Sequence, residues 1–290
     1  MYEAKVLADS ICNGHRLTTM QLTHPRIIHS EFMTHGMFAR NASSSRAIPF
    51  KKMVQRVIDD PYIPRTFGVN QKGMQAFTYL EGAAYREAKE IWLEARNYSV
   101  NCAKVLADPD VLNIHKQIVN RLLEPWMWIT VCVTGDAGAW SNYFALRCHA
   151  DAAEAIADQA YMAQLAYFKS IPKDLEIGEW HLPYLSVDDY IDSPSNDRNS
   201  LWVIRKEVSI GRCARTSYLT QEGKRDPQED VKLFERLKSS VPMHASPFEH
   251  VCEAMGDDIR YAKYIGWRSY RHTLPNEYVT DFKPNHPELV

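Results

Sequence analysis

The start of the chain carries a pattern typical of a β-hairpin followed by a helix. Apolar and polar residues alternate through residues 3–24, on both sides of Asn13-Gly14. Asn-Gly between two alternating segments is the strongest short-range indication of a hairpin, so we expect two antiparallel strands. Pro25 is a good first residue for a helix, and the apolar residues of 25–35 recur near helical spacing. A helix is therefore predicted over residues 25–35.

Residues 75–106 predict a long amphipathic helix, because apolar residues recur there at steps of three and four. The stripe consists of Phe77, Leu80, Ala84, Ala88, Ile91, Ala95, Tyr98, Cys102 and Val105. We expect this stripe to be buried within the chain, and a subunit interface is the alternative. Residues 115–124 predict a shorter helix that ends before Pro125, and residues 127–134 are typical of a buried strand.

Further along, Asp136 is expected to cap a helix over residues 137–149, and an alanine-rich helix is expected to continue to about Phe168. Residues 186–200 are polar and rich in turn formers, which makes them the best candidate for a linker.

The last third of the chain predicts a strand over residues 202–210 and then a helix. Asp226 as cap, Pro227 at the first helical position and Glu229 at the third together indicate a helix start. Helices outnumber strands in these predictions. The expected fold class is therefore a mixed α/β or α+β fold, with a mixed sheet and several long helices.

Composition places the chain among folded globular proteins, with 45% hydrophobic and 24% charged residues. The formal charge of −2 offers no broad field for a polyanion, so we expect no polymeric nucleic acid as a partner. The sequence contains neither a membrane-spanning apolar run nor a signal-peptide pattern at its start. We therefore expect a cytoplasmic protein with no membrane contact.

The six cysteines are scattered without Cys-x-x-Cys spacing, and we expect free thiols, not disulfides or zinc ligands. His244, Glu249 and His250 could suggest a metal site. Their spacing is not the i, i+4 spacing of a helical zinc motif, so no metal is expected.

Residues 34–49, "THGMFARNASSSRAIP", concentrate hydrogen-bonding groups between two apolar stretches. Asn41, three consecutive serines and Arg46 supply amide, hydroxyl and guanidinium donors that suit a phosphate group. The alternative is a polar loop that caps the next helix, because Ser and Asn are preferred caps. Composition alone favours the capping loop.

Two other segments hold residues suited to ligand binding. In the first, Arg121, Asn142 and Arg147 flank the predicted strand at 127–134 and the helix after it. The second is "HASPFEH", residues 244–250, which sets two histidines, Ser246 and Glu249 around a proline. For Arg147 the alternative is an ion pair with Asp151, one helical turn further on.

The spacing of these residues resembles the flavin-dependent thymidylate synthase family. The family signature is Arg-His-Arg-x-x-Ser-x-Asn-Glu-x-Ser-x-Arg, and His35, Asn41, Ser44 and Arg46 fall in register with it.

Three further motifs of the family have similar stretches here. Its Arg-x-x-Leu-Pro is similar to "RLLEP" at Arg121, and its Asn-x-x-x-Leu-Arg to "NYFALR", which runs from Asn142 to Arg147. Its His-x-Ser-Pro-Phe-Glu-His is similar to "HASPFEH" at residues 244–250, preceded by "CARTSYL".

The order of the motifs differs from the common family arrangement, in which the last two segments come first. This order resembles a circular permutation, which is acceptable when the old termini lie close together. It predicts that residues 202–250 pack beside the first 50, and that residues 1–290 form a single domain of this family's fold in permuted order.

The resemblance implies reductive methylation of dUMP at C5, with methylenetetrahydrofolate as carbon donor and NADPH reducing FAD. It also implies a homotetramer with active sites built from several subunits. Two alternatives stay open: hydroxymethylation or a related C5 modification of a pyrimidine deoxynucleotide, and a nucleotide-binding homologue without redox chemistry.

Residue roles follow from the resemblance position by position. Ser44, Arg46 and Arg121 would hold the nucleotide phosphate, and Glu31 occupies the place of a family Gln that contacts the nucleotide. Arg147 would bond the pyrimidine ring and, with Ser44, is the predicted catalytic residue. The residues expected to line the flavin are His35, Asn41, Asn142, His244 and Ser246.

The chain also departs from the signature, with Thr34 and Gly36 in place of arginines, and Ala39 and Ala42 in place of Ser and Glu. Gly36 matters most, because an arginine there would supply a cation to the flavin. Arg26 or Arg40 could replace it. The phosphate-binding residues match the family better than the flavin-binding ones, which is why a non-redox homologue stays an alternative.

Overall fold

The Asn13-Gly14 turn joins two long strands, β1 (Glu3–Cys12) and β2 (His15–Pro25), which pair antiparallel as predicted. Both turn residues have positive φ, 46° and 86°, the backbone conformation that a two-residue hairpin turn of this kind requires. The computed structural model describes residues 1–185, 198–216 and 226–279.

The central sheet has the strand order β3-β4-β2-β1-β5. Strand β4 (Trp128–Asp136), predicted at 127–134, pairs antiparallel with both β2 and the short β3 (Ala39–Ala42). Strand β5 (Lys173–Asp174) lies parallel to β1, so the sheet is mixed. The predicted mixed α/β class is confirmed.

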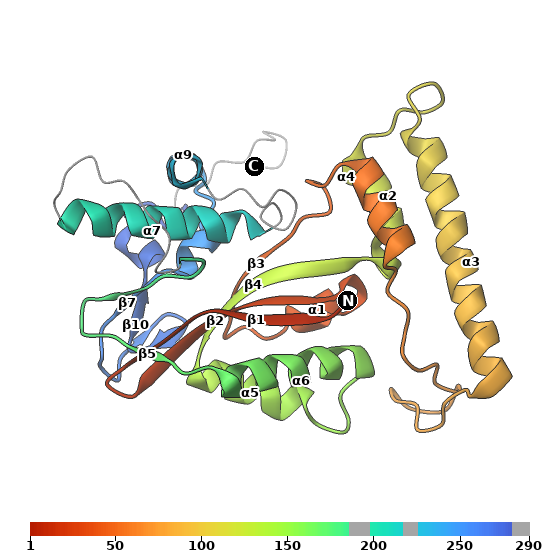
Figure 1. Ribbon diagram of the computed structural model, residues 1–290, viewed down its shortest axis with the longest axis horizontal. Helices are drawn as coiled ribbons and strands as arrows, with labels where there is room; N and C mark the ends of the chain where they lie inside the picture. Colours follow the sequence, from red (N-terminus) through yellow and green to blue (C-terminus); the bar gives the residue numbers. More distant parts are fainter. Residues whose placement is uncertain (186–197, 217–225, 280–290) are drawn as a thin grey trace, which may run out of the picture.

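Helices α5 (Ala137–Arg147) and α6 (Glu154–Lys169) cover one face of this sheet (Figure 1). The Asp136 carboxylate accepts a hydrogen bond from the Ala139 N–H, which confirms the predicted cap. The two helices are separated by a turn at residues 148–153, so α6 begins as a helix of its own. The core between helices and sheet includes Met20, Leu22, Val131, Val133, Trp140 and Ile156.

The last third of the chain forms a second layer, in which α7 (Arg198–Ala214) and α9 (Pro227–Lys238) lie over a three-stranded sheet with the order β10-β7-β6 (Figure 1). Its strands are β6 (Trp180–His181), β7 (Cys252–Ala254) and β10 (Trp267–Ser269). A small ladder, β8 (Arg260–Tyr261) with β9 (Tyr264–Ile265), and the 3-10 turns η3 (Ser246–Glu249) and η4 (Tyr270–Thr273) complete this part.

The prediction of a strand at residues 202–210 is wrong, because this segment lies in the helix α7. Tertiary packing overrides the β-like composition: α7 crosses α9, and Gly211 lets the backbones approach so closely that a Cβ would lie 2.4 Å from the Asp230 carbonyl oxygen. The helix predicted from Asp226-Pro227 is confirmed, and Asp226 accepts a hydrogen bond from the Gln228 N–H.

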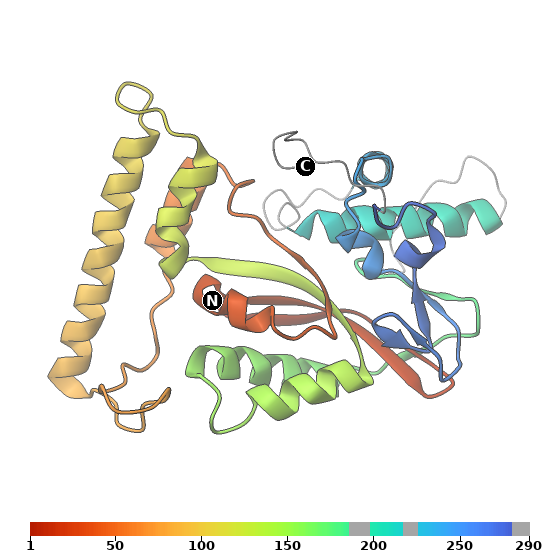
Figure 2. The ribbon, with the colours of Figure 1, turned by 180° about the vertical axis from the view of Figure 1, so that it is seen from behind.

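The far end of the molecule consists of α2 (Phe50–Asp59), α3 (Gly82–Ala107), α4 (Lys116–Val119) and η2 (Asn120–Trp126) (Figures 1 and 2). The helix predicted over 115–124 is thus short, and a 3-10 turn continues through Pro125. The helix predicted over 25–35 is likewise reduced, to η1 (Arg26–Ile28) and α1 (His29–Phe32), before the chain turns into β3.

The long predicted helix exists as α3 but begins at Gly82, and its predicted stripe is not buried within the chain. Ile91, Tyr98 and Val105 are 58%, 74% and 53% exposed. The face that packs inward carries Val100 and Ala103 instead, next to α2 and η2. This expectation was therefore wrong for a single copy of the chain.

Residues after 202 do pack beside the first 50, as the permuted order predicts. The Asn41 side chain donates a hydrogen bond to the Cys213 carbonyl at 2.6 Å and accepts one from the Ser246 hydroxyl at 3.3 Å. The division into one domain stays a prediction, and most of the linker candidate at 186–200 lies outside the described residues.

All six cysteines are free thiols, as predicted. Within residues 1–185, 198–216 and 226–279, no helix is both long enough and apolar enough to cross a membrane.

Candidate functional site

Strand β3 divides the candidate residues between the two faces of the sheet. Alternation along a strand sends Arg40 and Asn41 to opposite sides. Arg40 reaches α1, where its guanidinium donates to the Met33 carbonyl at 2.7 Å, whereas Asn41 reaches Cys213 in α7. The sequence motif "ARNA" thus supplies one polar side chain to each face.

Arg147, the last residue of α5, lies between two other predicted site residues. Its Nε donates a hydrogen bond to His35 Nε2 at 2.9 Å, and its Nη1 forms a close ion pair with Glu31. The alternative pairing with Asp151 is wrong, because Asp151 lies next to His149 instead, at 3.6 Å. The structure therefore brings Glu31, His35 and Arg147 together.

His35 is held as a neutral hydrogen-bond acceptor. Burial, together with the nearby Arg147 and Arg40, lowers the pKa of its imidazole to about 4. Because Nε2 accepts the bond from Arg147, the ring proton resides on Nδ1. Tyr143 packs edge-on against the imidazole, with ring centroids 4.8 Å apart. This packing fixes the ring, and through it the plane of the guanidinium.

The arrangement leaves Arg147 able to bind a ligand. Its side chain is 20% exposed, and a guanidinium has five N–H donors, of which Glu31 and His35 use only some. A planar, permanently charged donor held from two sides is suited to a carbonyl oxygen that becomes negative during a reaction.

The serine-rich loop that follows β3 docks on α4 and η2. The Asn120 amide donates to the carbonyls of Ser45 and Ile48, at 2.7 and 3.0 Å, and Lys116 donates to the Ala47 carbonyl at 3.0 Å. Docking brings the loop, with Ser44 and Arg46, to the segment that carries Arg121. The capping alternative is wrong, because α2 starts after Pro49 and receives no side-chain cap.

Around the docked loop, Ser45, Arg26 and Arg121 form a second group of residues, which surrounds the carboxylate of Glu124. Its Oε1 accepts a hydrogen bond from the Ser45 hydroxyl at 3.4 Å and lies 3.7 Å from both Arg26 Nη2 and Arg121 Nη1. An adjoining hollow of about 410 Å³ is lined by Arg26, Ile27, His29, Ser30, Glu124 and Pro125. Reasoning from the sequence did not assign Glu124 any role, although it lies inside "RLLEP" where the family has Leu.

The first group, which consists of Glu31, His35 and Arg147, is connected to the group around Glu124 by α1 and the turn before it. Arg26 precedes His29 and Glu31 by a few residues, and Arg26 and Arg40 both lower the pKa of His29, after burial, to about 4. Arg26 and Arg40 therefore lie near His29, Arg40 and Arg147 near His35, and Arg26 and Arg121 near Glu124.

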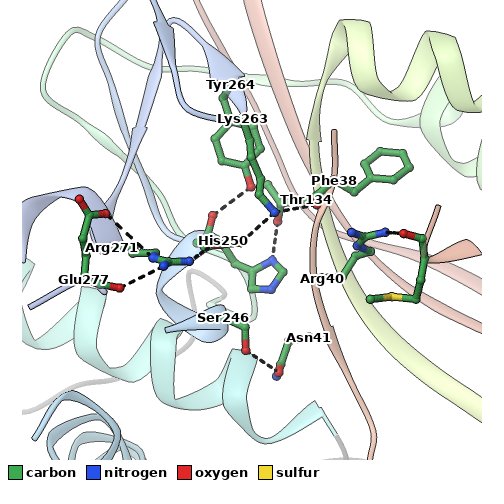
Figure 3. Close-up of polar contacts among 12 residues, drawn as sticks. Phe38, Arg40, Asn41, Thr134, Ser246, His250, Lys263, Tyr264, Arg271 and Glu277 are labelled. Atoms are coloured by element: carbon green, nitrogen blue, oxygen red, sulfur yellow. Dashed lines mark hydrogen bonds and ion pairs between the residues drawn. The ribbon is translucent and has the colours of Figure 1, made fainter. Parts of the chain in front are cut away.

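A third group of residues, which includes Asn41, Ser246 and His250, lies on the opposite face of the sheet (Figure 3). Ser246 points toward Asn41, and the Lys263 ammonium donates to the Phe38 carbonyl at 3.1 Å and lies 3.2 Å from the Glu249 carboxylate. His250 is buried and its Nδ1 is 2.8 Å from the Thr134 hydroxyl. His244, also predicted for the flavin, has an exposed side chain.

The predicted flavin residues do not surround one common space within a single chain. His35 and Asn142 lie on the α5 side, and Asn41, His244 and Ser246 on the other side. The Asn41 amide donates one hydrogen bond and accepts one inside the protein, which leaves it one N–H and one lone pair. At Gly36 a Cβ would have open space within 4 Å, and Arg40 and Arg147 both lie close enough to His35, the preceding residue, to lower its pKa. Within one chain the residues predicted to line the flavin therefore lie in two separate places.

No metal site accompanies these groups. Across the part of the chain that the structure describes, no three His, Cys, Asp or Glu side chains gather in a way that could hold a metal ion.

Comparison with known proteins finds similarity in structure and not in sequence. No protein-family model matches the chain, and no curated protein matches its sequence. The chain is similar to the flavin-dependent thymidylate synthase ThyX from Helicobacter pylori, complexed with FAD and dUMP, at 12% identity over 54% of this chain and 68% of that one, with a TM-score of 0.37.

The chain is also similar to the UMP/dUMP methylase PolB from Streptomyces cacaoi, bound with 5-Br UMP. That similarity has 14% identity over 58% of this chain and 89% of the other, with a TM-score of 0.47. At these values both similarities concern the fold of about half the chain, and they say nothing of its reaction.

Proposed function

We propose that this protein binds a pyrimidine deoxynucleotide monophosphate and modifies its base at C5. The finer form of the proposal is reductive methylation of dUMP, with methylenetetrahydrofolate, FAD and NADPH. The observation that carries it is the arrangement of Arg147, fixed by Glu31 on one side and by neutral His35 on the other.

The proposed task of Arg147 is to stabilise negative charge on the pyrimidine ring. When C5 of a uracil ring becomes nucleophilic, charge collects on a ring carbonyl oxygen, and a guanidinium already in place stabilises it without reorganisation. Glu31 and His35 hold the guanidinium before substrate binds. Neutral His35 adds no competing positive charge, so Arg147 remains the cation at this position.

The proposed phosphate end of the site is the docked serine loop. Ser44 and Arg46 lie in the loop that packs against the segment of Arg121, and a hydroxyl with two guanidinium groups suits a phosphate dianion. Arg26, which borders the same hollow, joins this group.

Flavin would supply the hydride for methylation. Because one chain does not gather the predicted flavin residues, we derive no step through the flavin, and two copies of the chain would have to contribute to its binding. The glycine at position 36, where the family has an arginine, is the feature that favours the second candidate, a nucleotide-binding protein without redox chemistry.

The test is incubation of purified protein with dUMP, methylenetetrahydrofolate, FAD and NADPH, followed by the mass of the nucleotide product. A gain of one methyl group supports thymidylate synthesis, and a gain of hydroxymethyl supports the related modification. A colourless protein that binds dUMP without turnover supports the non-redox candidate. Failure to bind or convert dUMP and dCMP would disprove the proposal.

A further inference from the structure

Glu124 lies next to two of the arginines that are proposed to hold the nucleotide phosphate. A single oxygen, Oε1, faces the Ser45 hydroxyl at 3.4 Å and the guanidinium groups of Arg26 and Arg121, both at 3.7 Å. A hydroxyl and two guanidinium groups around one anionic oxygen are also what a bound phosphate oxygen would receive.

The Glu124 carboxylate has only long contacts with the cations around it. A strong guanidinium–carboxylate hydrogen bond is about 2.7–2.9 Å long, so both arginines are beyond hydrogen-bond distance and attract Glu124 by charge alone. The Arg121 side chain is 54% exposed and therefore free to move, and the hollow beside Arg26 opens at this point. A ligand with more oxygens and more charge can displace a contact of this kind.

We infer that Glu124 occupies the phosphate position as an internal anion, which an incoming nucleotide monophosphate must displace. The inference rests on the proposed function, and it adds the regulation of that site. A phosphate group carries a charge of about −1.5 to −2 at neutral pH. Glu124 therefore repels it and engages the cations that would bind it, and the wild-type protein binds nucleotide monophosphates more weakly than its arginines alone would allow.

The experiment compares dUMP with deoxyuridine, which lacks the phosphate, by titration calorimetry on the full chain. Glu124→Gln keeps the shape of the side chain and removes its charge. We expect this variant to bind dUMP at least about tenfold more tightly than wild type, because the repulsion is gone and both arginines are released. Binding of deoxyuridine should stay within about twofold, because it places no charge near residue 124.

Glu229→Gln is the matched control. Glu229 also pairs with a cation three residues away, Lys232 at 2.7 Å, but on the exposed surface of α9. It should bind both compounds as wild type does. Circular dichroism establishes that each variant is folded, and Glu124→Ala, which removes the same charge, provides a second measurement should Glu124→Gln fail to fold.

Three results would overturn the inference, and they differ in what they leave standing. If wild type binds dUMP and the charge-neutral variants bind it no more tightly, Glu124 is only a clamp for the loop, and the proposed function stands. An equal gain for deoxyuridine would place the effect away from the phosphate and has the same consequence. If wild type and variants all fail to bind dUMP, the inference falls together with the proposed function.

Discussion

Arg147 shows how much of a candidate site depends on a single side chain. It connects α5 to the segment before β3 through His35 and Glu31, and it remains partly open to ligand. Neither partner could be chosen from helical spacing, which favours Asp151. Glu31 and His35 become the partners because the segment between β2 and β3, which carries them, lies beside the C-terminal end of α5 in the fold.

Arg147→Ala is expected to abolish turnover of dUMP while the protein stays folded. Removing a donor aimed at a developing anion typically costs a factor of about 10²–10³ in rate. The measurement is product formation by mass, with thermal unfolding by circular dichroism beside it. Arg86→Ala, on the exposed surface of α3, is the control and should keep full activity. Turnover by Arg147→Ala at the wild-type rate would remove Arg147 from the mechanism.

A buried histidine makes stability depend on pH. Burial lowers the pKa of His181 from 6.5 to about 3, and its ring contacts the hydroxyls of Thr19 and Ser10 at 2.8 and 2.9 Å. Between these two pKa values the unfolded chain binds a proton that the folded chain does not. Stability is therefore present above pH 6.5 and is lost as the pH falls toward 3.

The expected loss from His181 is about 2 kcal/mol between pH 7 and pH 5. Denaturant unfolding of wild type and of His181→Gln at both pH values measures it. The variant is less stable at pH 7, because buried hydroxyls lose a partner, but its decrease on acidification should be smaller by that amount. Equal decreases in the two proteins would show that His181 does not carry this pH dependence.

At the scale of elements, the crossing of α7 and α9 depends on one glycine. Asp230 of α9 lies next to Gly211, and its buried carboxylate forms ion pairs with the buried Arg212 at 3.1 Å and with the partly exposed Arg215 at 2.8 Å. These ion pairs depend on the close approach of the two helix backbones. A wider separation would move the Asp230 carboxylate away from the guanidinium groups.

Gly211→Ala is expected to destabilise the protein by about 2–3 kcal/mol. The new Cβ would lie 2.4 Å from the Asp230 carbonyl oxygen, so the helices must separate, and overpacking of a core costs about this much. Gly36→Ala is the matched control, since nothing lies within 4 Å of its Cβ, and it should change stability by less than about 0.5 kcal/mol. The free energy of unfolding in denaturant distinguishes them, and a loss of equal size in both would contradict the packing explanation.

Elements also show where sequence patterns mislead. The hairpin at Asn13-Gly14, strand β4 and the caps Asp136 and Asp226 follow from local chemistry, and the structure has them where they were predicted. The segment 202–210 has a strand-like composition, yet it is helical, because its surroundings in α9 and η3 decide its conformation. Local preference is weak where tertiary packing, here that of Val208 and Ile210, supplies the larger free energy.

At the scale of the whole molecule, one chain presents an incomplete site and an uncovered helix. The residues expected around the flavin lie on both faces of the sheet, and α3 exposes Ile91, Tyr98 and Val105 to solvent. Burial within the chain was the favoured expectation for this stripe. The subunit interface, its alternative, is now the prediction that remains.

We expect the protein to assemble as a homotetramer in which the exposed stripe of α3 is covered. Analytical ultracentrifugation of wild type should give a mass of four chains. Tyr98→Glu combined with Val105→Glu should yield smaller species, because burying charges without partners costs several kcal/mol. Glu90→Gln, another exposed position on α3, is the control for a change in surface charge. A monomeric wild-type protein would contradict the prediction.

The sequence by itself determined the features that depend on neighbours along the chain: the hairpin, the caps, the mixed α/β class, and the residue types that suit a nucleotide. The resemblance to a known family also assigned Ser44, Arg46 and Arg121 to one group, although they stand in two segments far apart along the chain. Only the tertiary structure decided which distant side chains meet. Arg147 with Glu31 and His35, Glu124 between Arg26 and Arg121, and the division of Asn41 from His35 all depend on how strands pair and helices dock. Apart from the Arg121–Glu124 pair, which is three residues apart, a linear pattern cannot contain these contacts, because the partners lie in different elements of the fold.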